Sequence, residues 1–338
     1  MVCTPTRICG VSNICIISIN LLCDILILPT MQVAVLGATG ATGTSIIKAL
    51  QQAGNFSISA LVRPSSIERP ATRDLEAQGV RIIPFDLTDP VEESARKIQD
   101  YDVVLAAISI AATAQQIPLA TVAKAAGVRR FVPCFYAPVA PPKGVVALRD
   151  IKEDVLNHVK KLHLPYTVVD IGWWYQITLP RLPSGRIDSS VSGIATAIPG
   201  DGNVPSAFSS NEDFGKYIPH IIADPRTLNK SIFTFSDILT LNEIYDYLEQ
   251  KSGEKVPRQY MPGNDIVDRL ATFKGDTPAE SGEFFQMTVL QYWYSWAVRG
   301  DNTVEYARYL GYLIGKELYP DVKTTSFREY IQKVIGSQ

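Results

Sequence analysis

The sequence predicts an α/β protein with a Rossmann-type doubly wound parallel sheet and a smaller, mixed, mostly helical C-terminal region. The first observation is a short apolar strand, Val33 to Leu36, that runs straight into Gly37-x-x-Gly40-x-x-Gly43 and then into a helical pattern. The second is a series of apolar runs without polar alternation, which is typical of parallel strands buried on both faces. With 338 residues and 46% hydrophobic content, the chain can bury a core of this size.

From Met31 onwards, strand and helix patterns alternate as they do in successive βαβ units. Strands are expected at Gln32–Leu36, Ser57–Val62, Val80–Pro84, Val103–Ala107, Arg130–Pro133 and Tyr166–Val169. Helices are expected at Thr42–Ala53, Pro70–Gln78, Val91–Gln99, Thr113–Ala126 and Val145–Leu162. In such a sheet a ligand binds beyond the carboxyl ends of the strands.

The regular alternation ends after Gly172. Residues 180–205 are rich in Gly, Pro, Ser and Asp, which indicates hairpins and loops. Ser210-x-x-Asp213 resembles an N-cap with an acidic third residue and predicts a helix through about Ile222. Further helices are expected at Leu241–Lys251, Gly263–Thr272, Gly282–Trp296, Thr303–Leu318 and Ser326–Ile335. We therefore expect an N-terminal extension (1–30), an NAD(P)-binding Rossmann domain (31–172) and a substrate-binding region (173–338) packed over the cofactor crevice.

Charge and cysteine content exclude several classes of function. The net charge of −2 and the pI near 6.0 leave no electrostatic footprint for nucleic acid or an acidic membrane. Four of the five cysteines lie in the first thirty residues: Cys3, Cys9, Cys15 and Cys23. That segment predicts a dispensable extension or a mis-assigned start, with a membrane or targeting role as the alternative. Since only Cys134 follows, the body of the chain suits a reducing compartment, and a cytoplasmic location is expected.

Metal and hydrolase chemistry are not expected. The three histidines, His158, His163 and His220, lack metal-ligand spacing, and the chain has no Gly-x-Ser-x-Gly elbow. Cys134 is better explained as a buried inert thiol than as a nucleophile.

The glycine pattern predicts a site for a dinucleotide pyrophosphate. Gly37 permits the tight turn from strand to helix, Gly40 lets phosphate oxygens approach bare backbone, and Gly43 lets the helix pack on the sheet. The alternative is a merely tight turn without a ligand. The expected contacts are Gly37, Thr39, Gly40, Ala41, Thr42 and Gly43.

The end of the second strand favours NADPH or NADP+ over NAD. Arg63 and Ser65 follow that strand, and no acidic residue appears until Glu68. A guanidinium with a nearby hydroxyl suits a 2′-phosphate, whereas an acid there would bind the 2′-hydroxyl of NAD. The alternative is that Arg63 is a solvated loop cation. Asp86 and Leu87 after the third strand are expected to flank the adenine, although Asp86 is equally well explained as a helix cap.

Lys152 is the candidate proton-transfer residue. Short-chain reductases of the usual kind carry Tyr-x-x-x-Lys, but here Leu148 stands four residues before Lys152. A partly desolvated lysine near a cofactor can hold a proton for transfer to a substrate. A surface lysine on an amphipathic helix is the alternative.

Aromatic residues gather at the predicted crevice edge. Trp173, Trp174 and Tyr175 follow the sixth strand, and Phe135 and Tyr136 follow the fifth. Three consecutive aromatics cannot all face one core, so we expect some of them to line a pocket for a flat, aromatic or polyketide-like substrate. Core packing is the competing explanation.

Several stretches resemble the NmrA-like and isoflavone-reductase-like family of atypical short-chain dehydrogenases. The matching stretches are residues 35–43 (VLGATGATG), 61–63 (LVR), 127–133 (GVRRFVP), Lys152 and 164–167 (LPYT). Residues 172–176 (GWWYQ) and 317–321 (ELYPD) resemble the fungal branch. The resemblance runs from about Met31 to the C-terminus.

The resemblance implies an NADPH-dependent reductase that uses a single lysine, here Lys152, on aryl-conjugated or related phenolic substrates. The family's reductases commonly read Pro-Ser-Glu-Phe-Gly after the fifth strand, whereas this chain reads Pro133-Cys134-Phe135-Tyr136-Ala137. This departure leaves room for a different aromatic or polyketide substrate of secondary metabolism. The alternatives are an NADP(H)-sensing regulator that acts through protein contacts and a non-redox isomerase or cyclase. No oligomeric state is predicted.

Overall fold

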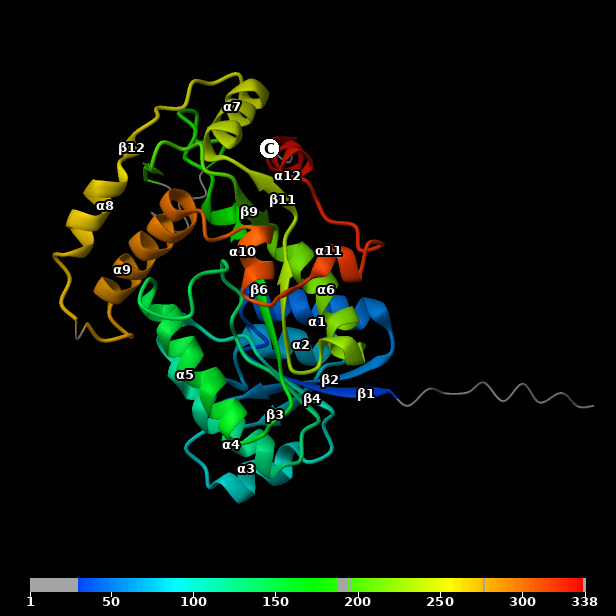
Figure 1. The fold of residues 1–338 in the computed structure, drawn as a ribbon. Coiled ribbons are helices and arrows are strands. Elements are labelled where there is room, and N and C mark those ends of the chain that lie inside the picture. Colours follow the sequence, from blue (N-terminus) through cyan, green and yellow to red (C-terminus); the bar gives the residue numbers. More distant parts are fainter. Residues whose placement is uncertain (1–29, 188–193, 195, 276, 337–338) are drawn as a thin grey trace, which may run out of the picture.

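A computed structural model describes residues 30–187, 194, 196–275 and 277–336 of the chain. The expectations for the N-terminal extension fall outside these residues. The first strands form a five-stranded parallel sheet in the order β3-β2-β1-β4-β5 (Figure 1). Its strands are β1 (Met31–Leu36), β2 (Phe56–Val62), β3 (Arg81–Pro84), β4 (Val103–Ala106) and β5 (Arg130–Val132).

Helices cover both faces of this sheet. They are α1 (Ala41–Ala53), α2 (Pro70–Ala77), α3 (Val91–Ile98), α4 (Gln116–Ala125) and α5 (Ala147–Lys161). Val33 and Val35 of β1 pack into a core with side chains of α1, α2 and α6 (Asn211–Ala223), whereas Ala34 packs with α3, α4 and α5 on the opposite face. The strands therefore bury both faces, as their unbroken apolar runs predict.

A second parallel sheet continues the first. β6 (Thr167–Ile171) pairs with β10 (Lys230–Thr234), which pairs with β13 (Leu313–Ile314). An isolated parallel bridge between Phe131 and Tyr166 joins β5 to the start of β6. Strands from the C-terminal half of the chain therefore extend the five-stranded sheet.

Most of the remaining elements gather above the first sheet in Figure 1, whereas two short helices, Val304–Tyr309 and Gly315–Leu318, pack beside β10 and β13. The strands there are β7 (Trp173–Trp174), β8 (Ile198–Pro199), β9 (Ser206–Ser209), β11 (Asp237–Leu239) and β12 (Tyr260–Met261). The helices are α7 (Leu241–Ser252), α8 (Gly263–Leu270), α9 (Gly282–Trp293), α10 (Val304–Tyr309), α11 (Gly315–Leu318) and α12 (Phe327–Gly336). Ser210 caps α6 by accepting a hydrogen bond from the Glu212 amide at 3.3 Å, as its position before the acidic turn predicts.

Three predicted helices differ from the structure. The prediction of a single helix over Thr303–Leu318 is wrong. α10 stops before Gly311, because the φ of +84° at this residue breaks the helix, and β13 and α11 follow. The helix expected from Thr113 begins instead as a 3-10 turn over Ile110–Gln115 before α4. The helix expected through Trp296 ends at Trp293 and continues as a π-helical turn, Tyr294–Arg299. In the described part of the chain, no helix is long and apolar enough to cross a membrane.

Candidate active site

The three glycines of the loop differ in how closely other atoms surround them. Gly37 has a φ of +83°, and a Cβ there would lie 2.2 Å from the Ala107 carbonyl oxygen. A Cβ on Gly43 would lie 2.2 Å from the Gly37 carbonyl oxygen, so α1 packs directly against the loop backbone. A Cβ on exposed Gly40 would meet no atom closer than 3.5 Å, which is an ordinary van der Waals distance. The loop therefore has the tight turn, the bare backbone and the close helix packing that a pyrophosphate site requires.

A cleft of about 940 Å³ opens at this loop. Its walls come from the loop itself and from the segments that follow β2, β3 and β4. The lining includes Gly37, Thr39, Gly40, Arg63, Ser65, Asp86 and Leu87 among the predicted residues. Ala41, Thr42 and Gly43 instead form the first turn of α1 behind the cleft, where first-turn amides have no helical partner. The volume and the glycine cradle fit a dinucleotide.

The part of the cleft wall that follows β2 carries positive charge. Arg63 is exposed at the end of β2 and lines the cleft with Ser65. Arg69 lines the same region, although the sequence analysis did not single it out. Two guanidinium groups with hydroxyl neighbours can bind a phosphate by charge-assisted hydrogen bonds.

Asp86 combines the two roles that its sequence position left open. Its Oδ1 accepts hydrogen bonds from the Thr88 amide at 2.9 Å and the Thr88 hydroxyl at 2.8 Å, and these bonds lower the pKa of the carboxyl group. The residue also lines the cleft beside Leu87. It therefore fixes its own turn and remains available to a ligand.

A further wall of the cleft was missed by the sequence analysis. It is formed by residues that follow β4: Ile108, Ser109, Ala112, Gln115 and Pro118. The available signal was their place after the carboxyl end of a central strand, where ligands bind in open parallel sheets.

Lys152 lies on α5 and is only 5% exposed. Its Nζ donates a hydrogen bond to the Phe135 carbonyl oxygen, and burial lowers the pKa of its ammonium group. In the same loop, the Cys134 thiol donates to the Ile108 carbonyl oxygen at 3.4 Å, and Ile108 lines the cleft. The loop that carries Cys134 and Phe135 therefore lies between Lys152 and the cleft. Burial raises the pKa of Cys134, so this residue is a neutral thiol at neutral pH.

A buried ion network lies beside Lys152. Arg149 donates to Asp170 Oδ2 at 2.6 Å and to the Tyr312 hydroxyl at 2.8 Å, and it pairs with Glu153 at 2.8 Å. Asp170 is fully buried, and its Oδ1 accepts no hydrogen bond from the described residues. This network fixes α5 against β6 and leaves one carboxylate oxygen without a partner.

The three consecutive aromatics alternate between two cores. Trp173 and Tyr175 face the C-terminal core, whereas Trp174 packs against Phe214 on the other side. Tyr175 is fully buried and its hydroxyl donates to Asp237 at 3.0 Å, as expected of a core residue. Phe135 is also fully buried, so core packing describes these two side chains better than an open pocket does.

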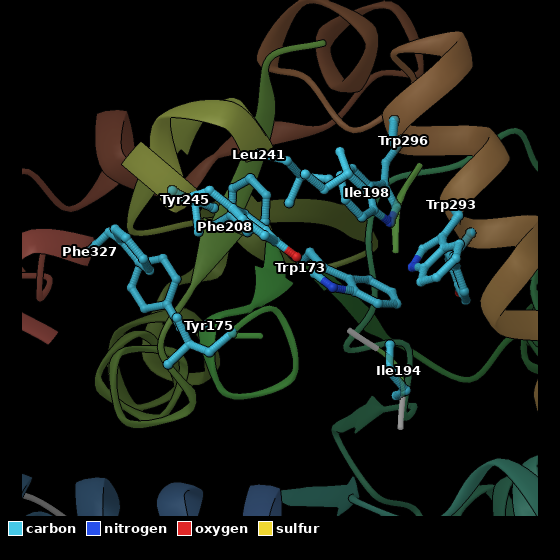
Figure 2. Close-up of a cluster of buried hydrophobic side chains, with 14 of the residues drawn as sticks. Trp173, Tyr175, Ile194, Ile198, Phe208, Leu241, Tyr245, Trp293, Trp296 and Phe327 are labelled. Carbon is cyan, nitrogen blue, oxygen red and sulfur yellow. The ribbon is translucent and has the colours of Figure 1, made fainter. Parts of the chain in front are cut away.

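Trp173 belongs to a dense aromatic cluster (Figure 2). Its ring lies 5.5 Å from that of Trp296 and 5.9 Å from that of Tyr292. The cavity among Trp173, Trp293 and Trp296 holds only about 10 Å³, which is room for one water. Tyr136 packs at 4.5 Å on Phe214, outside this cluster, and its hydroxyl has no partner among the described residues.

Comparisons with known proteins agree with this architecture. The model of the NmrA-like family matches residues 29–331. The chain is 38% identical over 313 residues to asnovolin J 5′,6′-dehydrogenase of Aspergillus novofumigatus, covering 90% of this chain and 96% of that protein. It is 28% identical to phenylcoumaran benzylic ether reductase TP7 of Nicotiana tabacum, covering 89% and 97%.

Solved structures show the same fold. The binary complex of leucoanthocyanidin reductase and NADPH from Vitis vinifera superposes with a TM-score of 0.74 at 22% identity, covering 90% of this chain and 99% of that one. Isoflavone reductase superposes with a TM-score of 0.73 at 23% identity, covering 89% and 98%.

Proposed function

The chain belongs to the NmrA-like family, and from that premise we propose that it is an NADPH-dependent reductase of an aromatic or polyketide-like secondary metabolite. The observation that carries this proposal is a buried lysine of lowered pKa, Lys152, separated from a dinucleotide-shaped cleft by a single loop. Its named relatives include a dehydrogenase and a benzylic ether reductase.

The residues of the cleft fit NADP(H). Gly37, Gly40 and the first turn of α1 would hold the pyrophosphate, and Arg63 with Ser65, joined by Arg69, would bind the 2′-phosphate. When bound, NADPH would supply a hydride for an electrophilic carbon of the substrate. The protein positions the substrate and keeps water away from that step.

Lys152 moves the accompanying proton. The residue holds its ammonium proton against the Phe135 carbonyl until a substrate oxygen or carbon replaces that acceptor. Because burial makes the charged form less stable, the proton leaves more readily than it does from an exposed lysine. Leu148, one turn earlier, packs in the aromatic core and supplies no proton.

The substrate lies between Lys152 and the aromatic cluster of Trp173, Trp293 and Trp296. These rings offer flat apolar surface on the C-terminal side of the crevice. Because the enclosed cavity is small, binding requires the cluster to open.

A dehydrogenase on the same site is the second candidate. The 38% identical relative is named a dehydrogenase, and hydride transfer and Lys152 serve oxidation as well as reduction. In that direction, neutral Lys152 accepts the proton.

Titration of the protein with NADPH and NADH, followed by assays in both directions, tests the proposal. Protein begun at Met31 is given NADPH with aryl-conjugated enones and quinones, or NADP+ with the corresponding saturated ketones and hydroquinones. Substrate-dependent oxidation of NADPH supports the reductase, and reduction of NADP+ supports the dehydrogenase. Tight NADPH binding without turnover refutes both and favours a regulatory sensor. An isomerised product without change in NADPH favours the non-redox catalyst, and failure to bind either nucleotide refutes the dinucleotide site.

A further inference from the structure

Tyr292 on α9 presents a buried hydroxyl without a partner. The residue is 4% exposed, and no group among the described residues forms a hydrogen bond with its hydroxyl. A buried phenol without a partner loses the free energy of a hydrogen bond that a ligand could restore. Its ring is held in place by Trp173 at 5.9 Å.

Two contacts direct α9 towards Lys152. The Gln291 side-chain oxygen accepts a hydrogen bond from the Ala147 amide at 2.9 Å, which fixes the end of α9 to the start of α5. Trp173, against which Tyr292 packs, follows β6, and β6 carries Asp170. Tyr292 therefore reaches the Lys152 region from the C-terminal part of the chain.

The charged surroundings agree with this placement. Besides burial, the same three groups shift the pKa of both Lys152 and Tyr292, namely Cys134, Asp170 and Arg149. Burial raises the pKa of Tyr292, so its hydroxyl stays protonated and donates a hydrogen bond. Lys152, with its lowered pKa, is the group suited to moving a proton.

We propose that Tyr292 is a specificity-determining residue that donates a hydrogen bond to a carbonyl oxygen of the substrate. This inference rests on the function proposed above and identifies a carbonyl group as the part of the substrate that the site recognises. The phenol comes from α9, and it supplies the donor that Leu148 cannot supply from α5. A ketone or enone bound here places its oxygen at Tyr292 and its apolar part against Trp173.

The test measures binding without turnover. Protein saturated with NADP+ is titrated with 4-phenylbut-3-en-2-one and with the hydrocarbon 1-phenylbut-1-ene, and tryptophan fluorescence is followed. The wild type should prefer the ketone, and Tyr292→Phe should weaken ketone binding about fivefold to tenfold without changing hydrocarbon binding. In the reductase assay the same variant should raise KM more than it lowers kcat.

Tyr217→Phe is the matched control. The buried hydroxyl of Tyr217 on α6 also forms no hydrogen bond with the described residues. The charged group that shifts the pKa of Tyr217 is Asp213, whereas the charged groups around Lys152 do not shift it. This variant should bind both probes like the wild type. Both variants should keep the melting temperature, since each loses only a hydroxyl without a partner.

Several results would overturn the inference. Ketone binding could be unchanged in Tyr292→Phe, or it could be lost in Tyr136→Phe instead. The wild type could also bind both probes equally or bind neither. Selective ketone binding that is lost in Tyr292→Phe, together with no oxidation of NADPH, would support the inference and refute the proposed reductase.

Discussion

Replacing Gly43 with alanine should separate the packing role of the loop from its ligand-binding role. The new Cβ would lie 2.2 Å from the Gly37 carbonyl oxygen and 2.8 Å from the Ala38 Cα, both backbone atoms that no rotamer change can move. Restoring van der Waals contact requires a shift of about 1 Å between α1 and the loop. Such a shift takes amide–phosphate distances out of the hydrogen-bonding range.

Loss of two charge-assisted bonds to phosphate costs about 3 kcal/mol or more, so Gly43→Ala should weaken NADPH binding by at least about 100-fold. Fluorescence titration with NADPH measures this effect, and thermal denaturation should show a lower melting temperature. Gly40→Ala provides the contrast, because its Cβ meets nothing closer than 3.5 Å in a backbone conformation open to alanine. It should weaken NADPH binding but leave the melting temperature unchanged or raised.

Gly282→Ala at the start of α9 controls for the substitution itself, since nothing lies within 4 Å of its new Cβ. This variant should bind NADPH like the wild type. Normal NADPH binding by Gly43→Ala would refute the argument that close packing of α1 shapes the site.

Three further predictions concern charged side chains. Arg63→Ala should weaken NADPH binding about tenfold and leave NADH binding unchanged. An equal effect on both nucleotides would refute the assignment of the 2′-phosphate to Arg63. Lys152→Met should lower turnover by about 10²–10⁴ with unchanged NADPH affinity. Burial lowers the pKa of Lys152, so the rate of reduction by the wild type should decline as the pH rises through a pKa below that of an ordinary lysine. This decline should be absent from the pH profile of the variant. Arg149→Met leaves the Asp170 carboxylate buried without its cation and should cost about 3–5 kcal/mol in chemical denaturation, and a loss below about 1 kcal/mol would contradict the network's role.

The sequence was most informative where local patterns and ligand chemistry coincide. The strand and glycine pattern from Val33 to Gly43 predicted the βα unit and its cleft, because Gly37 and Gly43 meet local steric demands of the turn and the helix packing. The predicted fold and family were confirmed. Lys152 could be singled out by its position and by the resemblance, and its role remains a prediction.

Long-range packing decided what the sequence could not reveal. β13 has only two residues, so no periodicity marks it, and its partner β10 lies far away in the chain. The alternation of Trp173 and Trp174 between two cores depends on β9 and α6 lying on either side. The unpaired hydroxyl of Tyr292 could be recognised only once α9 was placed against α5.

β6 lies between strands from the two halves of the chain, and this placement limits where segments can be exchanged between related enzymes. β6 belongs to the nucleotide-binding half by sequence, yet its outer edge is completed by β10, a strand from beyond residue 172. A recombination event that cut the chain there would leave a bare strand edge prone to aggregation. Grafts between related enzymes should therefore retain β6, β10 and β13 together and exchange only the segments inserted between them. Altered substrate range would then arise by drift within those inserts, with the sheet inherited intact.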